Sequence, residues 1–123
     1  MKKILIPAGE NSPEVLTDIQ EGLFSITGVM CPENPIPFFT RLESCFDEFV
    51  YICNREKTVV FQLIYFNSSS ARLIYRFLKR ISSVGNIRVA WYYEEGDTDL
   101  LESGQDYAEL TGLSFDFVAY RPQ

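Results

Sequence analysis

Nine consecutive residues, Thr58 to Phe66, constrain the fold of this chain more than any other segment. All of them except Gln62 are apolar, aromatic or β-branched, a composition that favours a β-strand. A run of this length with a single polar residue predicts a central strand that is buried on both faces. The rest of the chain must therefore supply the elements that cover this strand.

The apolar run stops at the tetrapeptide Asn67-Ser68-Ser69-Ser70, and the spacing of apolar residues then becomes helical. The apolar positions of this second segment are Leu73, Ile74, Phe77, Leu78 and Ile81. Three serines are thus expected where a buried strand meets the N-terminus of a helix. Free backbone N–H groups and the helix dipole favour negative charge at such a place.

The remaining segments predict one α/β domain over residues 1–123. Strands are expected over residues 3–6, 14–19, 23–28, 58–66, 87–93 and 113–118, and helices over residues 35–53, 68–81 and 100–110. Gly104 is expected to interrupt the last helix. Helices that separate strands imply parallel neighbours and right-handed crossovers, whereas residues 14–28 suggest a hairpin. We predict a mixed sheet with the helices mainly on one face.

Composition excludes several classes of function. The net charge of −6 argues against nucleic acid or an anionic membrane as the main partner, because both need a positive field. The chain contains no histidine, which removes the Ser-His-Asp and Cys-His machineries. Three cysteines without C-x-x-C spacing indicate reduced thiols, and we find no apolar run of membrane-spanning length. We therefore expect a cytoplasmic protein without a cofactor or a metal.

The serine turn has two interpretations. In the simpler one, Asn67 and the serines only cap the helix, as these residue types commonly do. In the functional one, a serine is phosphorylated, because a phosphate at a helix N-terminus gains from the dipole and from free N–H groups. Arg72 lies four residues after Ser68 and is within reach of such a phosphate.

Four sequence blocks point to a known family. They are Ser12-Pro13-Glu14, Pro32-Glu33-Asn34, Tyr65-Phe66-Asn67-Ser68-Ser69-Ser70 and Trp91-Tyr92-Tyr93-Glu94-Glu95. Together they make the chain resemble the SiaC family of bacterial regulatory phosphoproteins over nearly its full length. That family is similar in fold to the anti-sigma-factor antagonists, so the resemblance implies a STAS-like domain.

The resemblance also implies a function and a set of partners. Members are non-enzymatic, partner-switching proteins of signal transduction. They are phosphorylated by a Ser/Thr kinase with a histidine-kinase-like ATPase fold and dephosphorylated by a PP2C-like phosphatase. In the best-known branch the unmodified form binds and activates a diguanylate cyclase, which links the family to cyclic-di-GMP signalling. The phosphoacceptor of the family, usually threonine, follows the Asn of the turn and matches Ser68, with Ser69 as the next candidate.

An acidic stretch, Glu94 to Glu102, offers an alternative function. Its carboxylates are the oxygen ligands that Mg²⁺ or Ca²⁺ prefers, so the protein would be a small metal-binding protein or enzyme. The spacing does not fit a calcium-binding loop, however, and acidic residues are also common at a helix N-terminus.

Charged side chains on either side of the serine turn are candidates for partner binding. A basic side is expected on the second helix, and its members are Arg72, Arg76, Lys79 and Arg80. This side is either an ordinary solvated helix face or a docking surface for an acidic partner. Arg72 and Arg76, together with Glu94 and Glu95 from the acidic stretch, are the residues we expect to contact a partner.

Overall fold

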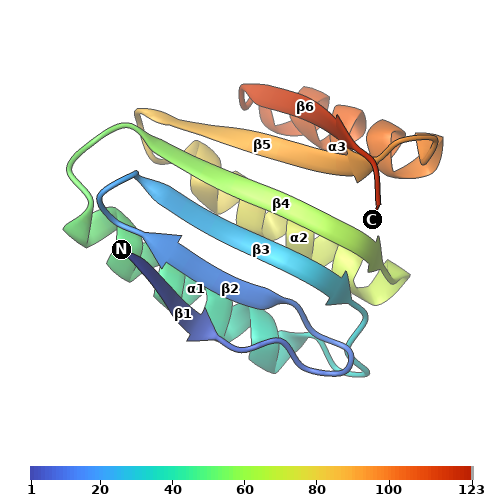
Figure 1. Cartoon of the computed structure of the whole chain (residues 1–123), viewed down its shortest axis with the longest axis horizontal. Helices are drawn as coiled ribbons and strands as arrows, with labels where there is room; N and C mark the ends of the chain where they lie inside the picture. Colours follow the sequence, from blue (N-terminus) through green and yellow to red (C-terminus); the bar gives the residue numbers. More distant parts are fainter. Residues whose placement is uncertain (123) are drawn as a thin grey trace.

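A six-stranded mixed sheet and three helices make up residues 1–122, which are the residues that the computed structural model describes (Figure 1). In chain order the elements are β1 (Lys2–Ile6), β2 (Glu14–Asp18), β3 (Leu23–Met30), α1 (Ile36–Ile52), β4 (Lys57–Phe66), α2 (Ser68–Ser82), β5 (Ile87–Glu94), α3 (Thr98–Thr111) and β6 (Phe115–Tyr120). The strands also lie in chain order within the sheet. β1, β2 and β3 pair antiparallel, and β3 to β6 pair parallel, so the predicted mixed sheet is confirmed.

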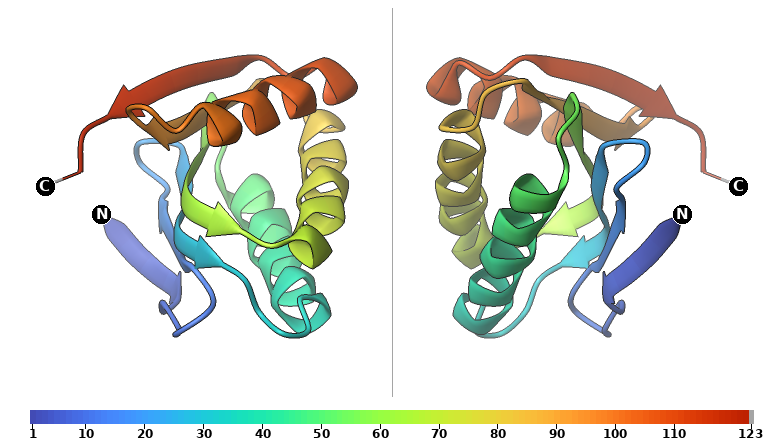
Figure 2. Two further views of the ribbon diagram at one scale, coloured as in Figure 1. Left: turned by 90° about the vertical axis from the view of Figure 1, so that its right-hand side faces the viewer. Right: turned by 90° about the vertical axis from the view of Figure 1, so that its left-hand side faces the viewer.

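All three helices cover the same face of the sheet (Figure 2). Each parallel connection moves one strand further in the same direction, and crossovers of one hand then place every helix on one side. This arrangement confirms the predicted placement of the helices. Among the described residues, no helix combines the length and apolar character that a membrane crossing needs.

Aromatic rings dominate the layer between the helices and the sheet. Phe77 of α2 lies at its centre, with its ring centroid 5.3 Å from that of Phe46 of α1 and 6.2 Å from that of Phe61 of β4. Phe24 of β3 joins the same cluster, 5.6 Å from Phe46. Large apolar side chains from both helices and both central strands thus fix α1 and α2 on the sheet.

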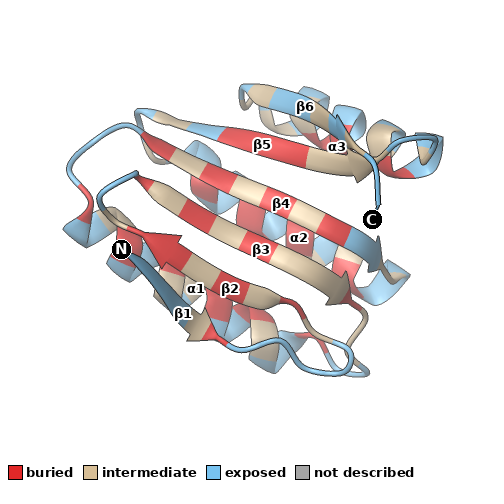
Figure 3. Cartoon of the chain, viewed as in Figure 1, coloured by how far each residue is buried: buried red, intermediate tan, exposed pale blue. Residues whose placement is uncertain are grey.

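The prediction that β4 is buried on both faces is wrong. Val59, Phe61 and Leu63 point toward the helices and are at most 1% exposed. On the opposite face Val60 is half-buried and Ile64 is 59% exposed, so burial alternates along the strand (Figure 3). Because every crossover lies on one side, nothing in the described chain covers the second face.

Some element boundaries also differ from those predicted. β3 continues to Met30, because its last residues still pair with the end of β4. α1 begins at Ile36 rather than one residue earlier, and Asn34 Oδ1 accepts a hydrogen bond from the Ile36 N–H at 3.2 Å. β6 begins at Phe115, two residues later than expected. These shifts are small and leave the order of the elements unchanged.

Gly104 does not interrupt α3, contrary to the prediction. A Cβ atom at this position would lie 2.6 Å from Cδ1 and Nε1 of Trp91. The Trp91 indole is almost fully buried and donates a hydrogen bond from Nε1 to the Leu100 carbonyl at 3.0 Å. Glycine is therefore present because α3 lies directly on the indole, and the helix continues through it.

Candidate functional site

The serine turn lies at the edge of the sheet where the parallel strands end. β3, β4 and β5 run in the same direction, so α1, α2 and α3 all begin at this edge (Figure 1). In open α/β sheets, binding sites are built outside the carboxyl ends of the strands. The positive ends of three helix dipoles also point toward this edge, which makes it favourable for an anion.

Asn67 fixes the geometry of the turn. Its backbone is extended, and its side-chain Oδ1 accepts a hydrogen bond from the Ser70 N–H at 3.1 Å, which caps α2. Its Nδ2 donates to the Pro32 carbonyl at 3.4 Å, and its backbone N–H donates to the Met30 carbonyl at 3.1 Å. Asn67 therefore ties the start of α2 to the segment that follows β3.

The three serines of the turn have different surroundings. The Ser68 side chain is exposed, and its hydroxyl makes no hydrogen bond with any described residue. The Ser69 hydroxyl donates to Asn67 Oδ1 at 3.2 Å. Ser70 is fully buried, and its Oγ has no hydrogen-bond partner among the described residues. Only Ser68 therefore presents an exposed hydroxyl that takes no part in the cap.

Replacing Ser70 with alanine is expected to stabilise the protein by about 1 kcal/mol, because a buried hydroxyl without a partner costs roughly 1–3 kcal/mol and alanine has the higher helix propensity. Urea unfolding followed by circular dichroism measures the change. Ser68→Ala, in which an exposed hydroxyl outside the cap is lost, is the matched control. A loss of stability in Ser70→Ala would show that the hydroxyl has a partner in solution.

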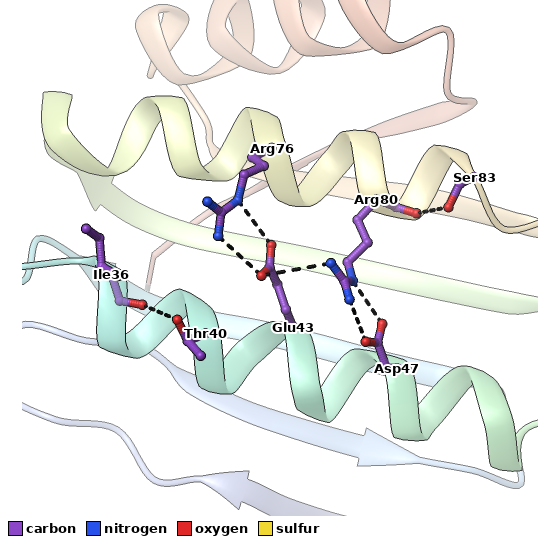
Figure 4. Close-up of polar contacts among 7 residues, drawn as sticks. All are labelled: Ile36, Thr40, Glu43, Asp47, Arg76, Arg80 and Ser83. Atoms are coloured by element: carbon purple, nitrogen blue, oxygen red, sulfur yellow. Dashed lines mark hydrogen bonds and ion pairs between the residues drawn. The ribbon is translucent and has the colours of Figure 1, made fainter.

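Two arginines of the predicted basic side form ion pairs with α1 (Figure 4). Arg76 contacts Glu43 through Nε and Nη2 at 3.4 and 3.3 Å. Arg80 contacts Asp47 at 2.9 and 2.6 Å and lies 4.0 Å from Glu43. The hydrogen bonds from Arg80 lower the pKa of the Asp47 carboxyl below its usual value. Arg76 and Arg80 thus join α1 to α2 and are already paired with carboxylates of this chain.

Arg72 differs from the other two arginines. It is exposed and forms no ion pair with any described residue. It borders an open groove of about 380 Å³ between the starts of α1 and α2, together with Pro35, Ile36, Ser68, Ser69 and Leu73. Ile36 is 60% exposed there. The groove therefore combines a free cation, an exposed aliphatic side chain and the hydroxyl of Ser68.

A second groove, of about 310 Å³, lies on the other side of the turn. Its lining residues are Ile64, Tyr65, Phe66, Asp97, Asp99, Leu100 and Ser103. The paired residues of β4 and β5 extend from Lys57 to Phe61 on β4, and the groove lies beyond them, between the end of β4 and the start of α3. Ile64 and Tyr65 are 59% and 56% exposed. Exposed apolar side chains therefore flank the serine turn on both sides, which the sequence did not indicate.

The acidic stretch is dispersed in space. Asp97 caps α3 by accepting a hydrogen bond from the Leu100 N–H at 3.0 Å, and Glu95 pairs with Arg121 at 2.7 Å. Glu94 ends β5 and is half-buried. Residues 1–122 contain no group of three or more His, Cys, Asp or Glu side chains placed to hold a metal ion. The structure thus gives the metal-binding alternative no support.

Tyr107 of α3 contacts the first turn of α2, a link that the sequence did not indicate. Its hydroxyl donates to the Ala71 carbonyl at 2.7 Å, and burial raises the pKa of this phenol to about 12. The Tyr107 ring also lies 5.8 Å from that of Trp91. The first turn of α2 is therefore held by α3 as well as by Asn67.

Comparison with known proteins identifies a family and structures of the same fold. A model of the SiaC family, described as regulatory phosphoproteins, matches residues 6–120. A structure of SiaC from Pseudomonas aeruginosa superposes with a TM-score of 0.80 at 24% identity and covers 96% of this chain and 99% of that chain. A structure of the diguanylate cyclase SiaD in complex with its activator SiaC, from the same organism, gives 0.82 at 23% identity, covering 94% and 98%.

An uncharacterized protein of Pseudomonas aeruginosa strain UCBPP-PA14 is 22% identical over 124 residues, which is 98% of each chain. The solved structures show that the fold is shared. The family model extends from the end of β1 to the end of β6 and includes the whole serine turn. The chain belongs to the SiaC family of regulatory phosphoproteins.

Proposed function

We propose that this protein is a non-enzymatic switch whose binding to a downstream effector is set by reversible phosphorylation of Ser68. The observation that carries the proposal is the difference between the three serines of the turn. Ser68 alone has an exposed hydroxyl without a hydrogen-bond partner in the described chain, and it is the first residue of α2. This hydroxyl is therefore accessible to a kinase without local unfolding.

Electrostatics favours Ser68 over Ser69. A phosphate adds about −1.5 to −2 charges at pH 7, and the first turn of a helix stabilises such a group. On Ser69 the phosphate would face Asn67 Oδ1, an acceptor that already receives the hydrogen bonds of the cap. Two sets of lone pairs would then repel each other, and the cap would weaken. Phosphorylation of Ser68 leaves the cap intact.

The proposal includes three partners, which the resemblance to the family implies. A Ser/Thr kinase with a histidine-kinase-like ATPase fold transfers the terminal phosphoryl group of ATP to Ser68 Oγ, with release of ADP and of the hydroxyl proton. A PP2C-like phosphatase hydrolyses the ester with water, which restores the serine hydroxyl and releases inorganic phosphate. The effector is a diguanylate cyclase, which is supported by the complex between SiaC and the cyclase SiaD in a structural relative. The unmodified form is the one that binds.

The surroundings of Ser68 suit a partner interface. Exposed Ile36 lies on one side of the turn and exposed Ile64 and Tyr65 on the other. Apolar side chains surrounded by polar ones are typical of a protein-binding surface. Arg72 and Glu94 remain candidates for its charged contacts, whereas Arg76 already pairs with Glu43 and Glu95 with Arg121.

The site assignment is tested by purifying the protein from its own organism as the parent, Ser68→Ala and Ser69→Ala forms. Intact-mass and fragment mass spectrometry then locate any phosphate. We expect one phosphate on the parent and on Ser69→Ala, mapped to Ser68, and none on Ser68→Ala. A phosphate that persists in Ser68→Ala, or a parent that is never modified, even after incubation with the kinase and ATP, would contradict the proposal.

A further inference from the structure

Four residues of α2 follow one another at intervals of one helical turn: Ser68, Arg72, Arg76 and Arg80. Residues four apart lie on the same side of a helix, so they form a row along the groove that faces α1. Arg76 and Arg80 are both matched by carboxylates of α1, Glu43 and Asp47, which are also four residues apart (Figure 4). The two helices thus present matched rows of opposite charge.

Arg72 has no matching carboxylate on α1. On the same side of α1, three and seven residues before Glu43, lie Thr40 and Ile36, neither of which carries a charge. The Thr40 hydroxyl donates to the Ile36 carbonyl of its own helix at 2.9 Å (Figure 4). Ile36 also shares the groove with Arg72. The row therefore ends with one cation that has no anion, next to the hydroxyl of Ser68.

We propose that Arg72 is the receptor for the phosphate on Ser68 and, in the unmodified protein, for a carboxylate of the protein partner. A negative group four residues before a positive one is the more favourable order on a helix, because it also agrees with the helix dipole. The phosphate would supply the missing third ion pair of the row. The inference rests on the proposed function for the identity of the modified serine and, in the partner contact, for the identity of the effector.

The partner contact has a defined chemistry. In the unmodified protein the Arg72 guanidinium and the exposed side chain of Ile36 line the same groove. This combination fits a protein segment that carries an Asp or Glu side chain next to an aliphatic one. Phosphorylation then acts by competition, because the phosphate is covalently attached four residues away and takes the same guanidinium.

Phosphorus NMR tests the phosphate contact without a partner. Phosphoserine is introduced genetically at position 68 in the parent, in Arg72→Gln and in the matched control Arg76→Gln. We expect the second pKa of the phosphate to be lower in the parent than in Arg72→Gln by about 0.3 units, the size that an exposed i, i+4 ion pair gives. Arg76→Gln is expected to keep the parent value. High salt should reduce the difference.

Equal pKa values in the parent and Arg72→Gln would overturn the assignment of the receptor. Because the phosphoserine is introduced genetically, this result does not depend on whether cells modify Ser68. Failure of the inference is thus distinguishable from failure of the proposed function.

The partner contact is tested with the purified diguanylate cyclase of the same organism. Unmodified Arg72→Gln should bind about tenfold more weakly than the parent, and Arg76→Gln should bind like the parent. Equal binding of Arg72→Gln and the parent would overturn the partner contact. A cyclase that does not bind the unmodified parent would contradict the proposed effector and the partner contact together, and the NMR result would still decide the phosphate contact.

Discussion

Replacing Gly104 with valine is expected to lower the free energy of unfolding by about 3 kcal/mol, a large overpacking effect. The first added carbon would lie 2.6 Å from the Trp91 indole, well inside van der Waals contact. The indole cannot easily move away, because Nε1 is hydrogen-bonded to the Leu100 carbonyl and the ring packs 5.4 Å from that of Phe61. α3 would have to shift on the sheet, and its contact with the first turn of α2 would shift too.

Urea unfolding of the two proteins measures this effect. Gly85→Ala is the matched control, because a Cβ atom there would meet nothing within 4 Å. The control is expected to change stability by less than about 1 kcal/mol. If Gly104→Val were as stable as the parent, α3 would not lie on Trp91 as described.

The order of the elements could be predicted because it depends on local periodicity. The apolar run 58–66, the helical spacing after it and the alternation over residues 87–93 each mark their element without reference to the rest of the chain. The exposed second face of β4 could not be predicted, since Val60 and Ile64, on either side of the polar Gln62, are as apolar as the side chains of a strand covered on both faces. Which face is covered depends on the direction of the crossovers. The prediction that Gly104 interrupts α3 was wrong for a similar reason. The glycine makes room for Trp91, which lies on another element.

In the candidate site, too, local features could be predicted and features that depend on other elements could not. Asn67 as the cap and the serines at the start of α2 follow from residue type and position. The differences between Ser68, Ser69 and Ser70 depend on hydrogen bonds and burial that the sequence does not contain. The separation of Arg72 from Arg76 and Arg80 depends on where α1 places Glu43 and Asp47. The sequence spacing alone does not distinguish Arg72 from the paired Arg76 and Arg80.

Phosphorylation of Ser68 is expected to weaken effector binding by at least roughly 100-fold, or about 2.7 kcal/mol. The added charge would lie between the exposed side chains of Ile36 on one side and Ile64 and Tyr65 on the other. An interface over these side chains would have to desolvate a phosphate of nearly two charges, of which Arg72 offsets only one, and burial of uncompensated charge is costly. Capture of Arg72 by the phosphate would remove a contact as well.

The most direct test of this account is a titration of the purified diguanylate cyclase with three forms of the protein. These are the unmodified protein, the form with phosphoserine at position 68, and a control with phosphoserine at position 44, an exposed position on α1. We predict tight binding of the unmodified and the position-44 forms and at least roughly 100-fold weaker binding of the position-68 form. Equal affinity of the position-68 form and the unmodified protein would contradict the account.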